Sequence, residues 1–286
     1  MASNLAGAGW NVTAWNRSDT VFEDLSGVRR AASVAELRSE NTIIFMLPDL
    51  PFIEEAATEL LESWRNDPPE PGTAVVIMSS VSPTAVRLFG ETVHQASGGN
   101  AAVVDAPVSG GTSGAQSGSL AIMVGATESQ FEALEPLLGT MGTTVRRMGP
   151  LGSGSLAKAC NQLIVGTTTA ALAEAAELAE RSGMDVVALY EVLSGGLAGS
   201  RVLDNVGPRL AAKDYAPTGP AKFMHKDLGF VLTSAEAVGS AVPMASAAID
   251  LYDELKRQGL GDLDLAVVRQ AIANLSVAAT AGSNSN

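Results

Sequence analysis

Ala101-Ala-Val-Val-Asp-Ala-Pro-Val-Ser-Gly-Gly111 is the stretch of sequence that decides the fold and first points to chemistry. It opens with a continuous apolar run, which is typical of a strand buried on both faces. It then breaks into a segment of glycines and small residues. Because glycine lacks a Cβ, backbone N–H groups in such a segment can approach a small anion, and a serine hydroxyl lies at the same place. An ordinary glycine-rich turn is the alternative. We expect a carboxylate-binding loop made by Ser109, Gly110 and Gly111.

Short apolar runs of the same kind lie on both sides of this stretch and alternate with helical patterns. They are rich in Val, Ile, Thr and Met, as in strands of a parallel sheet covered by helices. The alternation predicts an α/β domain with a Rossmann-like, doubly wound sheet. The predicted strands are Asn11–Trp15, Thr42–Leu47, Thr73–Ser79, Ala101–Val104, Leu120–Val124 and Thr144–Met148. The helices between them are predicted over Phe52–Trp64, Pro83–Ala96 and Glu128–Met141.

After residue 150 the strand signals end and helical patterns follow one another. We therefore predict a nucleotide-binding domain over residues 1–150 and an all-helical domain over residues 151–286. The first helix of the second domain is long, rich in Ala and apolar nearly all round, which predicts burial by other helices and a core position for Cys160. Ala278–Asn286 is expected to be a disordered tail. The predicted helices run from Ser153 or Ser155 to Ser182, over Val186–Ser194 and Arg201–Lys213, from Met224 to Val238, and over Ala245–Gln258 and Asp264–Ser276.

The start of the chain departs from the usual nucleotide-binding pattern. Such a domain opens with a strand, a glycine-rich turn and a helix, in that order. Here Asn4–Gly9 has the pattern of the end of that helix, and no G-x-G-x-x-G stands near it. We expect the first strand and its phosphate-binding turn to be absent from this sequence, through truncation, a misassigned start or a real variant. The strand would be central, so its loss is expected to cost much of the domain's stability.

Composition limits the classes of function. Of the 286 residues, 46% are hydrophobic and 17% charged, which is typical of a globular protein. The net charge of −13 argues against nucleic acid as a partner, because phosphates repel such a surface. No apolar run is long enough to span a bilayer and no secretory signal is visible, so no membrane association is expected. A single cysteine excludes an internal disulfide and fits a cytoplasmic location. His94 and His225 have no metal-ligand spacing around them, so no metal is expected.

Three short segments in the first domain end predicted strands at the edge where open α/β sheets bind ligands. Asn16-Arg17-Ser18 follows the strand after which NAD enzymes place an acidic residue. An arginine with small polar neighbours suits the extra 2′-phosphate of NADP instead. The alternative is a solvated arginine in a turn. Leu47-Pro48 and Ser80 follow two further strands and are weaker candidates for cofactor contacts.

A lysine early in the long helix is the candidate for proton transfer. Lys158, Asn161 and Gln162 are spaced at i, i+3 and i+4, so they share one face of the helix. A lysine on a mostly buried helix is costly unless it is paired or used, and an amine held there is suited to general acid or base catalysis. A lysine that extends to solvent from the helix end is the alternative. His225-Lys226-Asp227 opens a later helix and is a weaker signal.

These residues resemble the β-hydroxyacid dehydrogenase family. The segments that carry the resemblance are DAPVSGGTSGAQSGSLAIMVG, GSGSLAKACNQLIV and KDLGFVL, in the family's order and spacing, and the similarity covers nearly the whole chain. The family includes 3-hydroxyisobutyrate dehydrogenase, tartronate semialdehyde (2-hydroxy-3-oxopropionate) reductase and glyoxylate or succinic semialdehyde reductases. The family's glycine loop, about a dozen residues upstream, is the part that this sequence lacks.

The resemblance implies an NAD(P)-dependent oxidoreductase that interconverts a small β-hydroxy acid and its semialdehyde, and a homodimer or homotetramer. NADP is expected, with NAD possible. Asn-Gln beside the lysine resembles the tartronate semialdehyde reductase branch. Three alternatives to this assignment are considered. An imine reductase usually lacks the lysine, so Lys158 argues against it, whereas 3-hydroxyisobutyrate dehydrogenase remains an alternative within the family. An inactive scaffold or binding protein is the alternative of a different class. The implied roles are Lys158 as the general acid or base; Ser109, Gly110, Gly111, Asn161 and Gln162 as substrate contacts; and Asn16, Arg17, Ser18, Leu47, Pro48, Ser80 and Lys226 as cofactor contacts.

Overall fold

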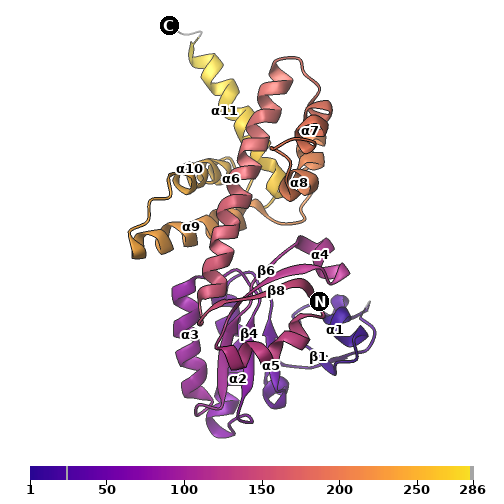
Figure 1. Cartoon of the computed structure of the whole chain (residues 1–286), viewed down its shortest axis with the longest axis vertical. Helices are drawn as coiled ribbons and strands as arrows, with labels where there is room; N and C mark the ends of the chain where they lie inside the picture. The colour runs from indigo at the N-terminus through magenta and orange to yellow at the C-terminus, as the bar shows by residue number, and fades with distance from the viewer. Residues whose placement is uncertain (24, 284–286) are drawn as a thin grey trace. The chain divides into compact units, whose positions relative to one another are not determined.

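The computed structural model describes residues 1–23 and 25–283 and divides into two compact units, Met1–Lys158 and Ala159–Asn286 (Figure 1). The division falls inside helix α6 (Ser153–Arg181), a few residues after the boundary that the sequence predicts. A mixed sheet with helices forms the first unit and helices form the second. The predicted fold class, a Rossmann-like α/β domain followed by an all-helical one, is therefore confirmed.

A six-stranded sheet forms the centre of the first unit. Its order is β3-β4-β5-β7-β6, with β8 pairing β7 off this path. The strands β3, β4 and β5 are parallel to one another, as the apolar runs predict. The strands are β3 (Thr42–Phe45), β4 (Thr73–Ile77), β5 (Ala101–Asp105), β6 (Val108–Ser109), β7 (Leu120–Gly125) and β8 (Gly142–Gly149).

The expectation of a parallel sheet is wrong at β7, which runs antiparallel to both β5 and β6. Ala106 and Pro107 alone separate β5 from β6, and the connection from β6 to β7 is also short. A parallel neighbour needs a crossover of a dozen or more residues, so the chain turns back here. The glycine-rich stretch predicted as a loop contains β6 and a short helix, α4 (Gly111–Ser117).

Helices cover both faces of the sheet, and the strand side chains alternate between the two resulting cores. Val75 and Ile77 pack in one cluster with helices α2 (Leu50–Asn66) and α3 (Pro83–Ala96). Val76, between them, packs in the other cluster with α5 (Glu128–Leu138) and α1 (Ala2–Gly7). Burial on both faces explains why these strands have continuous apolar sequences.

Local signals fix where the helices of this unit begin. Ser82 caps α3, with Pro83 directly after it, and Thr127 and Gln130 form a reciprocal capping box on α5. At the start of α2 the carboxylate of Asp49 accepts a hydrogen bond from the backbone N–H of Leu50. The helices predicted from their patterns alone lie at these positions, with small differences at the ends of α2 and α5.

Two further strands form a separate, parallel, two-stranded sheet. They are β1 (Val12–Ala14), which was predicted, and β2 (Val28–Arg30), which was not. Two short 3₁₀ helices, η1 (Asp19–Phe22) and η2 (Val34–Ser39), connect this pair to β3. Within the described residues, β1 pairs with β2 alone and β3 ends the larger sheet. The first unit therefore has two sheets where a doubly wound domain has one.

The second unit is built from helices around one apolar core. The tyrosine hydroxyls of Tyr190 and Tyr252 donate hydrogen bonds to backbone carbonyl oxygens of α6, at Leu172 (2.7 Å) and Gly166 (3.3 Å). No described helix is long and apolar enough to cross a membrane. The remaining elements are α7 (Val186–Ser194), α8 (Arg201–Ala212), α9 (Ala221–Val238), α10 (Pro243–Arg257), η3 (Leu265–Val267) and α11 (Val268–Ser283).

Three expectations for this unit are corrected. Cys160 is exposed on α6 and is not a core residue. Ile164 and Leu178 of the same helix are also exposed, by 64% and 70%, so α6 is not buried all round. Composition could not show which side of an Ala-rich helix lacks a neighbour. The predicted tail is helical as far as Ser283, since α11 continues through it, and residues 284–286 lie outside the described residues.

The first turn of α6 lies directly against the sheet. A Cβ on Gly154 would lie 2.2 Å from the Met123 carbonyl oxygen and 2.7 Å from that of Asp105. Both distances are far below van der Waals contact. Only glycine therefore allows the helix to approach the backbones of β5 and β7 this closely.

We expect Gly154→Ala to lower the free energy of unfolding by about 1–3 kcal/mol or more, because the added methyl group overpacks a backbone contact. Chemical denaturation followed by circular dichroism measures this change. The matched control is Gly229→Ala on α9, where an added Cβ meets nothing within 4 Å. That change should be neutral or slightly stabilising. Equal stability of the two variants would contradict the close packing of α6 on the sheet.

Candidate functional site

The carboxyl ends of β3 and β4 bring two of the predicted cofactor segments to one edge of the sheet. The two strands are parallel neighbours, so Leu47-Pro48 and Ser80 follow adjacent strands at the same edge. The backbone N–H of Leu47 donates a 2.8 Å hydrogen bond to Oγ of Ser79, a buried serine after β4. This bond fixes the two loops to each other.

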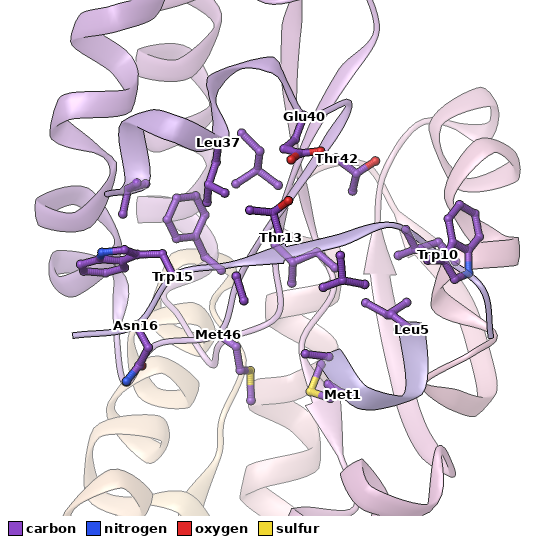
Figure 2. Close-up of a pocket in the computed structure, with 18 of the residues that line it drawn as sticks. Met1, Leu5, Trp10, Thr13, Trp15, Asn16, Leu37, Glu40, Thr42 and Met46 are labelled. Carbon is purple, nitrogen blue, oxygen red and sulfur yellow. The ribbon is translucent and has the colours of Figure 1, made fainter. Parts of the chain in front are cut away.

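The third predicted cofactor segment follows β1. Asn16 Nδ2 donates to the carbonyl oxygen of Ser18 (3.0 Å), and the hydroxyls of Ser18 and Thr20 are 2.9 Å apart. These bonds give the segment a turn in which Arg17 is exposed. Asn16 and Leu47 line the same cavity, so the segments after β1 and β3 face a common hollow (Figure 2).

The predicted carboxylate-binding residues form the link between β6 and α4. Gly110 has φ +137° and Gly111 has φ +64°, conformations that side chains with a Cβ rarely adopt. Gly110 and Gly111 are exposed and Ser109 is half-buried. The chain therefore turns sharply here with accessible backbone, as the glycines predict.

A buried carboxylate joins this motif to the helix of the predicted lysine. Asp105, the last residue of β5, is fully buried. The backbone N–H groups of Gly152 and Ser155 donate to its two carboxylate oxygens, at 2.7 and 2.5 Å. These are donors at the start of α6 that have no partner within the helix, so Asp105 caps α6 from the sheet. Burial raises the pKa of Asp105 above its ordinary value, while the two N–H groups act in the opposite direction by favouring the carboxylate.

Lys158 lies in the second turn of α6, one turn beyond this cap. The residue is only 9% exposed, which argues against the alternative of a lysine extended into solvent. Asn161 and Gln162 follow on the same helix and are half-buried. Asp105 thus fixes the start of the helix that carries all three predicted residues.

In the second unit, hydrogen bonds connect the polar pair of α6 to the start of α9. Asn161 Nδ2 donates to Gln162 Oε1 (2.9 Å), and Gln162 Nε2 donates to Asp227 Oδ2 (2.7 Å). Lys226 Nζ lies 3.2 Å from Asp227 Oδ1 and 4.9 Å from the centre of the Phe230 ring. Asp227 is 4% exposed. The structure therefore brings the adjacent residues Asn161 and Gln162 together with Lys226, which is far from them in the sequence, beside one buried carboxylate.

Two acidic residues, Asp105 and Asp227, are the organising groups that the sequence prediction left without a role. Both stand in quoted motifs, Asp105 at the end of an apolar run and Asp227 between Lys226 and an apolar run. A carboxylate beside buried positions requires hydrogen-bond donors, and this requirement was the signal in the sequence that could have identified both residues. Which groups provide them could not be predicted, because the partners lie 47 to 65 residues away in the chain.

The neighbouring histidine takes part in an ion pair of its own. His225 Nε2 lies 2.8 Å from Asp253 Oδ1 on α10. Among residues 1–23 and 25–283, no group of three His, Cys, Asp or Glu side chains is close enough to hold a metal ion.

Comparison with known proteins matches both units. Residues 1–149 match the family model described as the NAD binding domain of 6-phosphogluconate dehydrogenase. Residues 152–272 match the model described as NAD-binding of NADP-dependent 3-hydroxyisobutyrate dehydrogenase. The chain belongs to the β-hydroxyacid dehydrogenase family. Proteins of this family are NAD(P)-dependent hydroxyacid dehydrogenases, so this chain is an oxidoreductase with a nicotinamide cofactor.

Individual relatives agree with this assignment. The chain is 33% identical over 274 residues to 2-hydroxy-3-oxopropionate reductase of Escherichia coli K12, covering 95% of this chain and 92% of the relative. It is 32% identical to the NAD-dependent L-serine dehydrogenase of Pseudomonas aeruginosa, covering 94% and 92%. The structure of 3-hydroxyisobutyrate dehydrogenase from Salmonella typhimurium superimposes with a TM-score of 0.86 at 26% identity and 94% coverage of both chains.

We expect Asp105→Asn to lower the free energy of unfolding by about 1–3 kcal/mol, because an amide NH₂ would face a backbone N–H and leave it without an acceptor in a buried place. Thermal and chemical denaturation measure the loss. The control is Asp185→Asn, since Asp185 caps α7 at an exposed position through one N–H group and asparagine caps equally well. A loss no larger than that of the control would contradict the role of Asp105 as the cap of α6.

Proposed function

We propose that this chain catalyses the NADP-dependent interconversion of a small β-hydroxy acid and its semialdehyde, with tartronate semialdehyde as the preferred substrate. The observation that carries the proposal is the buried Lys158 on a helix whose first turn is fixed to the end of β5. The same strand leads directly into Ser109, Gly110 and Gly111. The helix that carries Lys158 and the proposed substrate-binding turn are therefore both anchored at Asp105, the last residue of β5.

The chemistry assigned to the chain is proton transfer and substrate binding. When bound, the nicotinamide supplies or accepts the hydride. Lys158 Nζ donates a proton to the carbonyl oxygen as the carbonyl carbon is reduced, and takes the hydroxyl proton in the opposite direction. The backbone and hydroxyl groups of Ser109, Gly110 and Gly111 hold the substrate carboxylate. Asn161, oriented through Gln162 and Asp227, contacts the substrate beside the lysine.

The residues at the carboxyl edge of the first unit fit the adenosine part of a dinucleotide. Leu47, Pro48 and Ser80 lie on adjacent loops, and the turn of Asn16, Arg17 and Ser18 faces the same hollow as Leu47. Arg17 is exposed and able to pair with a 2′-phosphate, which favours NADP over NAD. Lys226 is assigned to the cofactor from the resemblance, with Asp227 and Phe230 holding its side chain.

Tartronate semialdehyde is favoured by the Asn161-Gln162 pair and by the 2-hydroxy-3-oxopropionate reductase among the relatives. The second candidate is 3-hydroxyisobutyrate, because relatives and superimposed structures also carry that name. Turnover with tartronate semialdehyde, glyoxylate, succinic semialdehyde and 3-hydroxyisobutyrate, compared as kcat/KM, separates these possibilities. A kcat/KM for 3-hydroxyisobutyrate above that for tartronate semialdehyde would replace the first candidate with the second.

Association into a homodimer or homotetramer is part of the same proposal. The helical unit exposes large apolar side chains that cost free energy in water and are typical of an interface between subunits. Leu197 is fully exposed, and Val238, Val192 and Leu178 are 78%, 75% and 70% exposed. Oligomerisation through the helical unit would bury these side chains.

We expect Lys158→Ala to lower kcat about 10²- to 10⁴-fold, the usual contribution of a positioned acid or base, while NADPH still binds. Steady-state kinetics and a fluorescence titration with NADPH measure the two effects separately. The control is Lys222→Ala, which removes an exposed lysine paired with Asp262 and should leave kcat unchanged. Near-normal turnover of the Lys158→Ala variant would refute the assignment.

Arg17→Ala should raise the KM for NADPH about tenfold and leave the KM for NADH unchanged, because only NADPH carries the 2′-phosphate. The ratio of the two KM values is the decisive quantity. Arg65→Ala provides the matched control, since Arg65 is an exposed arginine in the last turn of α2. An equal rise in both KM values would place Arg17 away from the 2′ position.

A further inference from the structure

The strand β8 forms an open edge of the larger sheet. It pairs with β7 alone, and within the described residues no strand pairs with its other side. With eight residues it is longer than any other strand that the structure describes. An edge of this kind presents unpaired N–H and C=O groups and is a template for a further strand. The exposed residues of the edge are Thr143, Thr144, Arg146, Arg147 and Met148.

Two irregularities divide this edge and leave one regular stretch between them. The pairing with β7 shifts in register before Thr144 and again after Arg147. From Thr144 to Arg147, successive residues pair with successive residues of β7. Because a bulge bends a strand and interrupts its ladder, regular pairing with a further strand is limited to this stretch. Successive residues direct their N–H and C=O groups to alternate sides, so half of these residues direct them away from β7.

The side chains of the regular stretch give the edge a positive charge. Arg146 and Arg147 are exposed, and neither pairs with a carboxylate in the part of the chain that the structure describes. Their hydrogen bonds go to neutral acceptors, the carbonyl oxygens of Val145 (2.8 Å) and Ala126 (2.9 Å). The whole chain has 31 Asp and Glu residues and 18 Lys and Arg residues, so two adjacent arginines without carboxylates are a local exception.

This charge decides which kind of strand the edge accepts. A second copy of the chain would bring a second pair of arginines to the same short edge, and like charges on neighbouring strands repel. Carboxylates are attracted instead. Because adjacent residues of a strand point to opposite faces, Arg146 and Arg147 are matched by two consecutive acidic residues, one on each face. An apolar residue fits opposite Val145, which is buried beside them.

We propose that the stretch of β8 from Thr144 to Arg147 is a docking edge for an extended acidic segment of another protein, which joins the sheet as an additional strand. The segment has two consecutive Asp or Glu residues with an apolar residue beside them. Backbone hydrogen bonds provide the affinity, and the charges provide the selectivity. None of the residues of this edge is assigned to the cofactor or the substrate, so the proposal does not depend on the dehydrogenase activity.

The test uses the full chain and a fluorescein-labelled peptide, Thr-Val-Glu-Glu-Val-Thr, with blocked ends. This sequence is the same in both directions, so it suits parallel and antiparallel pairing equally. We expect saturable binding by fluorescence anisotropy, with one peptide per chain, that weakens as salt screens the charges. Amide hydrogen exchange should become slower between Thr144 and Arg147 when the peptide is bound.

Two control peptides separate strand pairing from attraction between charges. Thr-Pro-Glu-Glu-Pro-Thr keeps both carboxylates but lacks two N–H groups, which point to opposite sides of a strand. It therefore loses a hydrogen bond whichever side faces β8, and we expect it to bind about tenfold more weakly. Thr-Val-Lys-Lys-Val-Thr keeps the N–H groups and reverses the charge, so it should not bind.

A charge-reversed variant examines the same contact from the side of the protein. Arg146→Glu/Arg147→Glu should lose the glutamate peptide and bind the lysine peptide, because the opposite charges then face each other again. The matched control is Arg65→Glu/Arg201→Glu, which gives the same net charge by changing exposed arginines of α2 and α8. It should still prefer the glutamate peptide. Circular dichroism verifies that both variants are folded, and if the first unfolds, the control peptides still provide the comparison with the unchanged chain.

Four outcomes overturn the proposal. The first is the absence of binding by the glutamate peptide. Equal affinity for the proline-containing peptide is the second, since it would mean attraction between charges without strand pairing. The third is the same loss of preference in both variants, which would make net charge the cause. The fourth is a dimer by light scattering in which β8 is protected from exchange before peptide is added, which would make a second copy the occupant.

Discussion

The two hydrogen bonds that Asp105 accepts from the start of α6 are the constraint on which the rest of the site depends. One buried carboxylate accepts from Gly152 and Ser155, and the lack of a side chain at Gly154 lets the helix reach the sheet. Asp105 also ends β5, directly before the turn of Ser109, Gly110 and Gly111. A single residue therefore fixes the starting points of the helix with Lys158 and of the predicted substrate loop. At this fully buried position the two backbone N–H groups provide the hydrogen bonds that a carboxylate needs.

A second buried carboxylate has the corresponding role in the helical unit. Asp227 accepts from Gln162 and pairs with Lys226, so residues of α6 and α9 are held in one network. Each unit thus contributes a part of the proposed chemistry that is organised by its own acidic residue. The family membership explains why these parts occur in one chain. The geometry explains how each part holds its polar side chains in place.

The two-sheet structure of the first unit has a physical consequence of its own. Strands β1 and β3 each present an edge to the cavity, while apolar walls from both cores cover it. Both features lie at the hollow that the turn after β1 and the loop after β3 share.

The sequence by itself determined the two-domain class, most strands and helices, the family and the candidate residues. It could do so because continuous apolar runs, helical patterns and the motifs around Ser109, Lys158 and Lys226 are local features. The antiparallel direction of β7, the exposure of Cys160 and the extent of α11 were decided by packing. The roles of Asp105 and Asp227 required the tertiary structure, since their partners lie far away in the chain. Sequence patterns show that a buried carboxylate needs donors, and only the folded chain shows which backbone and side-chain groups reach it.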